Sequence, residues 1–198
     1  MIAMVQQIYK GGFDSNFTYL LTSENGERAI IDPCGDCAAA LEKENIPEND
    51  VRYILITHGH SDHFDALDKV KRLYPASRTA GFYQAEFPRD ILLKDGDTLE
   101  FGGGVIKVLH TPGHSRDSVC YLWNCSLFTG DTVFVDCIGF CRSPKTMAQS
   151  LERILSLPGE LVVYPGHDYG RVPFRALAEE RAENPELAPE FISALYRG

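Results

Sequence analysis

Basic residues and long apolar runs are both scarce in this sequence. Lysine and arginine together number 19 against 28 aspartates and glutamates, and the formal net charge is -9. Binding to a nucleic-acid backbone requires a basic surface, so we expect no nucleic-acid partner. No apolar segment approaches the roughly 18–20 residues of a membrane-spanning helix, so we expect no membrane partner. The first residues lack the basic and apolar regions of a signal peptide, and the expected localisation is cytoplasmic.

Disulfide bonds are also not expected, although the chain contains six cysteines. In a chain of 198 residues without an export signal, free thiols are the more common state. Cys120 lies in a strand-like run and is expected in the core. The other cysteines of interest are expected at the edge of one cleft, and these are Cys34, Cys37, Cys137 and Cys141.

The order of secondary-structure signals predicts an α/β (α+β) domain, single over residues 1–198, with a short helical tail at 173–198. Nine short segments rich in β-branched or aromatic residues are predicted strands, at 3–9, 17–22, 28–31, 53–56, 78–81, 105–110, 118–123, 126–129 and 161–164. Four segments have apolar residues at helical spacing, at 37–44, 65–73, 145–157 and 174–183. Strand pairs early in the chain and strand–helix units later indicate sheets covered by helices.

The most informative segment is Thr-His-Gly-His-Ser-Asp-His at residues 57–63. It holds three of the six histidines of the chain and a carboxylate, directly after a predicted strand. Imidazole and carboxylate groups are ligands that divalent metals accept. A lone histidine is more often a surface or packed residue, but four donors spaced His-x-His-x-Asp-His predict a metal site at the rim of a sheet. These candidates are His58, His60, Asp62 and His63.

Three further candidate ligands, His114, Asp131 and His167, also follow predicted strands. Each alone would be interpreted as an ordinary turn residue. Loops at one edge of the sheets converge in a layered α/β domain, so we expect all seven side chains to share one site. His110 ends a strand and is interpreted as a structural residue.

In this order, the motifs resemble those of the metallo-β-lactamase fold superfamily, and most closely its hydroxyacylglutathione hydrolase (glyoxalase II) branch. The motifs are His-x-His-x-Asp-His, Thr-Pro-Gly-His-Ser, Gly-Asp and Pro-Gly-His, and the resemblance extends from residues 14–17 to residues 184–185. It implies a four-layer αββα sandwich with metals in a cleft at one edge. It also implies a metal-dependent hydrolase that cleaves a small-molecule thioester or related ester with a metal-activated water.

The resemblance further implies how the ligands divide between two divalent ions, with zinc as the first expectation and iron or manganese as alternatives. The first ion would be held by His58, His60 and His114. The second would be held by Asp62, His63 and His167, and Asp131 would bridge both. Asp62 and Asp131 are therefore also candidate catalytic residues, with Asp62 able to orient the attacking water.

Two residues are candidates for contact with the substrate. Tyr169 follows His167 by two positions, and its hydroxyl could donate to a substrate carbonyl or oxyanion, although a packed surface tyrosine is an equal alternative. Arg142 ends a segment that resembles the Gly-x-Gly-Arg segment of the family, with Cys141 in place of the second glycine. It could bind a substrate carboxylate or fix the loop.

Two other activities of the same fold stay open. A mononuclear-iron persulfide dioxygenase would hold its iron with His58, His114 and Asp131, and a lactonase is a further alternative. Glutathione-thioester hydrolases of the family carry a longer C-terminal helical extension than residues 168–198 provide, which indicates a smaller substrate or a reduced binding surface. The sequence does not indicate an oligomeric state.

Overall fold

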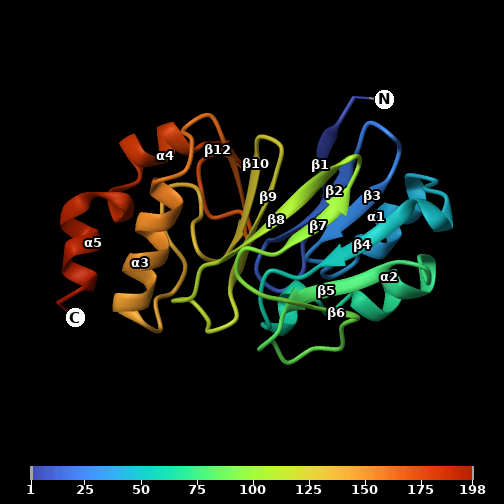
Figure 1. The fold of residues 1–198 in the computed structure, drawn as a ribbon, viewed down its shortest axis with the longest axis horizontal. Coiled ribbons are helices and arrows are strands. Elements are labelled where there is room, and N and C mark those ends of the chain that lie inside the picture. The colour runs from blue at the N-terminus through green and yellow to red at the C-terminus, as the bar shows by residue number, and fades with distance from the viewer. Residues whose placement is uncertain (1, 198) are drawn as a thin grey trace.

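Two six-stranded sheets lie face to face in the computed structural model, which describes residues 2–197, and helices cover the outer face of each sheet (Figure 1). The first sheet contains, in spatial order, β1 (Met4–Gly11), β2 (Asn16–Thr22), β3 (Arg28–Ile31), β4 (Val51–Leu55), β5 (Arg78–Phe82) and β6 (Ile91–Leu93). The second contains β12 (Arg175–Ala176), β11 (Val162–Pro165), β10 (Ser126–Gly130), β9 (Val119–Trp123), β8 (Gly104–His110) and β7 (Thr98–Phe101).

Five α-helices complete the layers over the described residues. The first sheet is covered by α1 (Cys37–Lys43) and α2 (Leu67–Leu73), and the second by α3 (Pro144–Leu155), α4 (Leu177–Glu183) and α5 (Pro189–Leu195) (Figure 1). Short 3-10 turns occur at η1 (Glu48–Asp50), η2 (Ser61–His63) and η3 (Pro185–Leu187). The predicted αββα sandwich is thus confirmed. Over residues 2–197, no helix combines the length and apolar content needed to cross a bilayer.

Three apolar layers hold the sandwich together. The central layer fills the space between the sheets with large side chains such as Tyr19, Tyr121 and Phe128. The outer layers pack α1 and α2 on the first sheet and the three later helices on the second. Every residue of β2 is buried because that strand has a neighbour on each side and a covered face above and below. Burial of one such large side chain stabilises the fold by about 1.5–3 kcal/mol.

The predicted helix over residues 174–183 is wrong at its start. Arg175–Ala176 pairs antiparallel with Val162–Val163 as strand β12, and the helix begins only at Leu177. The pairing places an arginine and an alanine on the sheet edge, where propensity for a helix is outweighed by tertiary hydrogen bonds. Strands β6 and β7 were not predicted, whereas helix α5 lies within the helical tail that was expected over residues 173–198. The other elements fall where they were expected, with ends shifted by no more than two residues.

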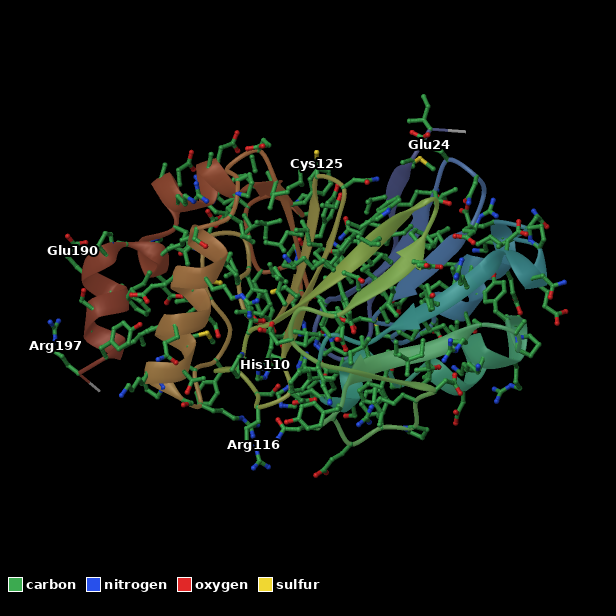
Figure 2. All side chains as sticks on the ribbon, in the orientation of Figure 1. Glu24, His110, Arg116, Cys125, Glu190 and Arg197 are labelled. Carbon is green, nitrogen blue, oxygen red and sulfur yellow. The ribbon has the colours of Figure 1, made fainter. Side chains whose placement is uncertain are left out.

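The strand directions bring several strand ends to one edge of the sandwich. β3, β4 and β5 are parallel neighbours in the first sheet, and β10 and β11 are parallel neighbours in the second. At this edge the sheets are joined directly, since the backbone N–H of Phe17 donates to the Gly166 carbonyl at 2.8 Å. Cys125, in the turn between β9 and β10, lies at the top of the view in Figure 2, and His110 and Arg116 lie in its lower half.

Candidate metal centre

The loop after β4 carries four of the predicted ligands in a tight turn that includes η2. The loop is tied to the segment after His114, because the N–H of Gly59 donates to the Asp117 carboxylate at 2.7 Å. A side chain at Gly59 would place its Cβ 2.9 Å from that same carboxylate oxygen. Gly59 therefore leaves room for the Asp117 carboxylate that connects the two loops.

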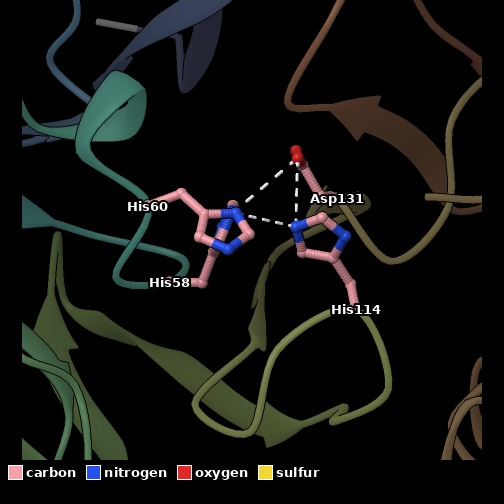
Figure 3. A group of neighbouring side chains, drawn as sticks. All are labelled: His58, His60, His114 and Asp131. Carbon is pink, nitrogen blue, oxygen red and sulfur yellow. Dashed lines mark hydrogen bonds and ion pairs between the residues drawn. The ribbon is translucent and has the colours of Figure 1, made fainter. Parts of the chain in front are cut away.

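One group of donors consists of His58, His60, His114 and Asp131 (Figure 3). The Nδ1 atom of His60 lies 2.9 Å from the Nε2 atom of His58 and 2.9 Å from the Nε2 atom of His114. The Asp131 Oδ2 atom is 3.5 Å from the Nε2 of His114 and 3.8 Å from that of His58. All four side chains thus direct a donor atom toward a common point, within 4.8 Å of one another.

A second group, Asp62, His63 and His167, lies directly beside the first. The Nε2 atoms of its two histidines are 3.2 Å apart, and the Asp62 Oδ2 atom is 3.7 Å from each. Asp131 connects the groups, because its Oδ1 is 3.3 Å from His63 Nε2 and its Oδ2 is 3.3 Å from His167 Nε2. The structure therefore brings together all seven residues that the sequence singled out as ligands.

Hydrogen bonds at the second ring nitrogen set the tautomer of two of these histidines. The Nδ1 atom of His114 is 3.0 Å from the carbonyl oxygen of Phe140, and the Nδ1 atom of His167 is 2.8 Å from that of Asp14. A carbonyl oxygen only accepts, so each Nδ1 must carry the proton. The Nε2 atoms of both rings then present lone pairs to the cluster.

Asp32 orders the other two buried rings in the same way. Its carboxylate accepts from the Nδ1 of His63 at 2.9 Å and from the hydroxyl of Thr57 at 2.7 Å. With its proton given to Asp32, the Thr57 oxygen accepts from the Nδ1 of His58 at 3.2 Å. These rings also turn unprotonated Nε2 atoms inward.

This arrangement fits divalent cations. The unprotonated Nε2 atoms of His63 and His167 face each other at 3.2 Å and repel unless a positive charge lies between them. The Asp131 Oδ1 atom is buried and has no hydrogen-bonding partner among residues 2–197. An unpaired carboxylate oxygen surrounded by imidazole lone pairs is a donor set for zinc or iron. The seven side chains therefore form a divalent-metal site. The way in which their donor atoms divide between ions stays a prediction.

Burial acts on the protonation of the cluster. It lowers the pKa of His58 and of His114, which keeps these rings neutral and able to donate lone pairs. For Asp131, burial raises the pKa, but the neighbouring His63 and His167 outweigh it and hold the pKa well below its usual range. The converse holds for the two rings beside that carboxylate, since Asp131 and Asp32 outweigh burial and raise the pKa of His63, and Asp131 likewise raises the pKa of His167. Without a cation, a proton therefore competes for these two rings.

Three residues that support the cluster were not identified from the sequence. Asp32 is buried at a positive φ of 49° directly after β3. Asn16 is buried and donates from its Nδ2 to the Oδ2 of Asp62 at 2.8 Å. Asp14 supplies the carbonyl for His167. A polar residue directly after an apolar strand was the available signal for Asp32; Asp14 and Asn16 had none.

Two glycines near the cluster make room for different neighbours. A Cβ at Gly166 would lie 2.3 Å from the Oδ1 of Asp131, so this glycine does make room for the cluster. A Cβ at Gly113 would instead lie 2.6 Å from the Cα of Met147. Gly113 therefore permits close packing of α3 against the loop that carries His114.

The cluster opens onto two adjacent clefts. The aromatic cleft, of about 580 Å³, is lined by cluster residues and by Phe13, Phe134, Phe140 and Tyr169. The polar groove, of about 780 Å³, is lined on the other side of His60 by residues that include Gln84, Glu86, Arg116, Asp117 and Arg142. His114 borders the first and His60 the second.

The predicted substrate residues both lie at these clefts. The Tyr169 ring stacks on His167 with centroids 5.0 Å apart, and its hydroxyl donates to the carboxylate of Asp14. Arg142 is exposed in the polar groove, and its charge contributes, after burial, to the lowered pKa of His60. The hydroxyl of Tyr169 is thus engaged within the protein.

The cysteine expectation is partly wrong. Cys34 and Cys37 are buried rather than at a cleft edge, and burial raises the pKa of Cys34 to about 12 and that of Cys37 to about 11. Cys120 is buried, as expected. Neither cleft is lined by a cysteine among the described residues. His110, interpreted as structural, stacks on Phe82 and takes no part in the donor groups.

A metal site built at one edge of an αββα sandwich, from donors that both sheets supply, defines a class of metal-binding α/β proteins. Within that class, the chain belongs to the metallo-beta-lactamase superfamily, whose family model matches residues 11–80 and 73–167. The two matches together contain all seven clustered donors.

The chain is similar to several proteins that carry different names. The probable polyketide biosynthesis zinc-dependent hydrolase BaeB of Bacillus velezensis is 35% identical over 170 residues, which are 80% of this chain and 76% of that protein. A hydroxyacylglutathione hydrolase of Photobacterium profundum is 33% identical over 180 residues, 88% of this chain and 70% of that one. The crystal structure of ETHE1 from Myxococcus xanthus matches with a TM-score of 0.83 and 30% identity, over 98% of this chain and 90% of that one.

Proposed function

We propose that this protein is a metal-dependent hydrolase that cleaves a thioester or a related small ester. The observation that carries the proposal is the convergence of unprotonated imidazole nitrogens on the buried Asp131 carboxylate, at the floor of an open cleft. Two similar proteins carry the name hydrolase, and one of them is named zinc-dependent.

In the proposed enzyme, His58, His60 and His114 hold one ion, and Asp62, His63 and His167 hold the other. Asp131 contacts histidines of both groups and would bridge the ions. When bound, divalent ions supply a water of lowered pKa as nucleophile and polarise the scissile carbonyl. Zinc is the first expectation, and iron and manganese are the alternatives.

The protein's own groups prepare the site for this chemistry. Asn16 donates to Asp62 and fixes one carboxylate oxygen, which leaves the other to orient a water. Asp32 and two backbone carbonyls hold the rings in the tautomers that leave lone pairs inward. Tyr169 forms part of the cleft wall over His167, and Arg142 in the polar groove is the proposed partner of a polar or carboxylate group of the substrate.

A persulfide dioxygenase with one iron is the second candidate. Its three expected ligands, His58, His114 and Asp131, are present in the first donor group. The hydrolase explains more of the site, because the single-iron arrangement gives no ligand role to His60 or to the second group of three donors. No observation favours a lactonase over either.

The test uses protein purified without added metal. Elemental analysis should find two divalent ions per chain, and the protein should release thiol from acyl thioesters without oxygen uptake. Replacement of His58 or Asp131 by alanine should lower the metal content and abolish thiol release, whereas His110→Ala should keep the full metal content. One iron per chain together with oxygen uptake on a persulfide would replace this proposal with the dioxygenase.

A further inference from the structure

Two phenylalanines at the mouth of the aromatic cleft are far more exposed than a phenylalanine in a stable fold normally is. Phe13, in the turn between β1 and β2, is 92% exposed, and Phe140, in the loop after Asp131, is 76% exposed. The first lies in a loop of the first sheet and the second in a loop that follows the second sheet. Both line the cleft that also contains His114 and Asp131. Neighbouring exposed apolar side chains at a concave site indicate a surface that an apolar ligand covers.

The deeper part of the same cleft is also aromatic. Phe134 is buried there, with its ring edge-on to Tyr169 at a centroid distance of 4.9 Å. The Tyr169 hydroxyl is occupied by Asp14, so the ring offers the cleft mainly its apolar surface. The wall therefore continues as aromatic surface from the solvent to the metal donors.

The other polar groups of this cleft disfavour an anion in it. Asp14, Asp62 and Asp65 line it, and among the described residues no lysine or arginine does. The polar groove has the opposite character, since Arg116 and Arg142 line it together with Gln84 and Glu86. The two clefts meet where His60 Nδ1 and His114 Nε2 are 2.9 Å apart. A ligand that occupies both must therefore pass over the first donor group.

We propose that the substrate lies across this junction, with an apolar acyl group of several carbons in the aromatic cleft and the polar thiol portion in the polar groove. The inference rests on the proposed function and adds the acyl class to it. Phe13 and Phe140 become the residues that select acyl length, because they lie at the mouth of the cleft. An acyl chain of several carbons extends to them, whereas an acetyl group is too short to do so. Desolvation of that chain favours longer acyl groups.

The experiment compares acetyl and hexanoyl thioesters of N-acetylcysteamine, which share one neutral thiol. The wild-type protein should hydrolyse the hexanoyl thioester with a kcat/KM at least about tenfold above that for the acetyl thioester. Phe13→Ala and Phe140→Ala should each lower the hexanoyl value about fivefold to tenfold and leave the acetyl value within about twofold. Phe13→Leu should retain most of the preference. The matched control is Phe174→Ala, at a half-exposed phenylalanine in a separate groove near β12, and it should change neither value.

A binding measurement separates the failure of this inference from the failure of the proposed function. The hydrolysis-resistant S-hexyl and S-methyl thioethers of N-acetylcysteamine are titrated calorimetrically into the metal-loaded protein. The S-hexyl compound should bind about tenfold more tightly, and Phe13→Ala should remove most of that difference. Thioester hydrolysis with no acyl-length preference, or equal losses on both thioesters in the phenylalanine variants, would overturn the inference and leave the hydrolase standing. Selective S-hexyl binding without thioester hydrolysis would support the apolar cleft and overturn the hydrolase.

Discussion

At the scale of single residues, the carboxylate with the widest influence on the metal centre is one that belongs to neither donor group. Asp32 accepts from His63 directly and reaches His58 through Thr57, so one buried side chain sets two ring orientations. It also accepts from the N–H of Thr57 at 2.8 Å, which fixes the start of the ligand loop. A partner of this kind orients the ligand and strengthens its basicity.

Asp32→Asn should therefore weaken metal binding without removing a ligand. The amide presents a donor to groups that themselves donate, so the inward lone pairs of His63 and His58 lose their support. We expect about a 10–100-fold loss of metal affinity, measured by competition with a chromogenic chelator. Asp97→Asn is the control, because Asp97 also accepts from a backbone N–H but lies in the exposed turn before β7. Unchanged affinity in Asp32→Asn would contradict this role.

The seven donors could be predicted because each combines a ligand residue type with a position directly after a strand. Asp14 and Asn16 could not be predicted in the same way. Asp14 reaches His167 across 153 positions of sequence, and Asn16 reaches Asp62 across 46. The contact of Asp14 with His167 exists only once the two sheets have packed, and that of Asn16 with Asp62 only once β2 and β4 lie in one sheet, so no local pattern encodes either contact.

At the scale of elements, the C-terminal helices support the metal centre from outside it. The loop between Asp131 and α3 is held by η3 and α4, since Glu186 accepts from the N–H of Ile138 at 2.7 Å and Asn184 donates to the carbonyl of Cys137 at 3.1 Å. The same loop supplies the Phe140 carbonyl that sets the tautomer of His114. Among the described residues, neither cleft is lined by residues 185–197, so this segment positions the loop instead of contacting substrate.

The ion pair between Arg175 and Glu180 anchors α4 beneath this loop. The Nη2 of Arg175 lies 2.5 Å from the Oε1 of Glu180, with side-chain exposures of 8% and 0%. Arg175→Met would leave a buried carboxylate without its partner and should lower the free energy of unfolding by about 3–5 kcal/mol, measured by urea denaturation.

Arg171 provides a matched control for that prediction. Arg171 forms ion pairs with Asp136 and Glu183, and its side chain is 68% exposed. Arg171→Met should therefore change the free energy of unfolding far less than Arg175→Met does. Equal effects of the two substitutions would show that burial does not set the strength of these pairs.

Element prediction was most successful where apolar patterns were long. The helix α3 was expected within two residues of its ends, because Met147, Leu151 and Ile154 recur at helical spacing after Pro144. β7 was missed because only Leu99 and Phe101 of its four residues are apolar, whereas β3, of the same length, was predicted from a run of three apolar residues. β12 is shorter still, and its identity depends on pairing with β11.

At the scale of the whole molecule, the metal centre joins the two halves of the sandwich. His58, His60, Asp62 and His63 follow the first sheet, whereas His114, Asp131 and His167 follow strands of the second. Bound ions would thus connect the sheets at an edge that hydrogen bonds also join, such as those from Phe17 to Gly166 and from Gly59 to Asp117. Without a cation, the same edge holds an ionised Asp131 with one unpaired oxygen among imidazole lone pairs. Metal binding and folding stability are therefore linked.

Removal of metal should destabilise the entire protein as well as inactivate it. A ligand present at one hundred times its Kd stabilises the folded state by about 2.7 kcal/mol, and for a chain of this size each kcal/mol shifts Tm by about 2–4 °C. We therefore expect dialysis against a chelator to lower Tm by about 5–10 °C, with recovery that depends on the zinc concentration, measured by calorimetry. Asp131→Ala should show a much smaller chelator-induced shift, because it lacks the side chain that contacts both donor groups. If wild type and Asp131→Ala respond equally to the chelator, the metal does not join the sheets through this site.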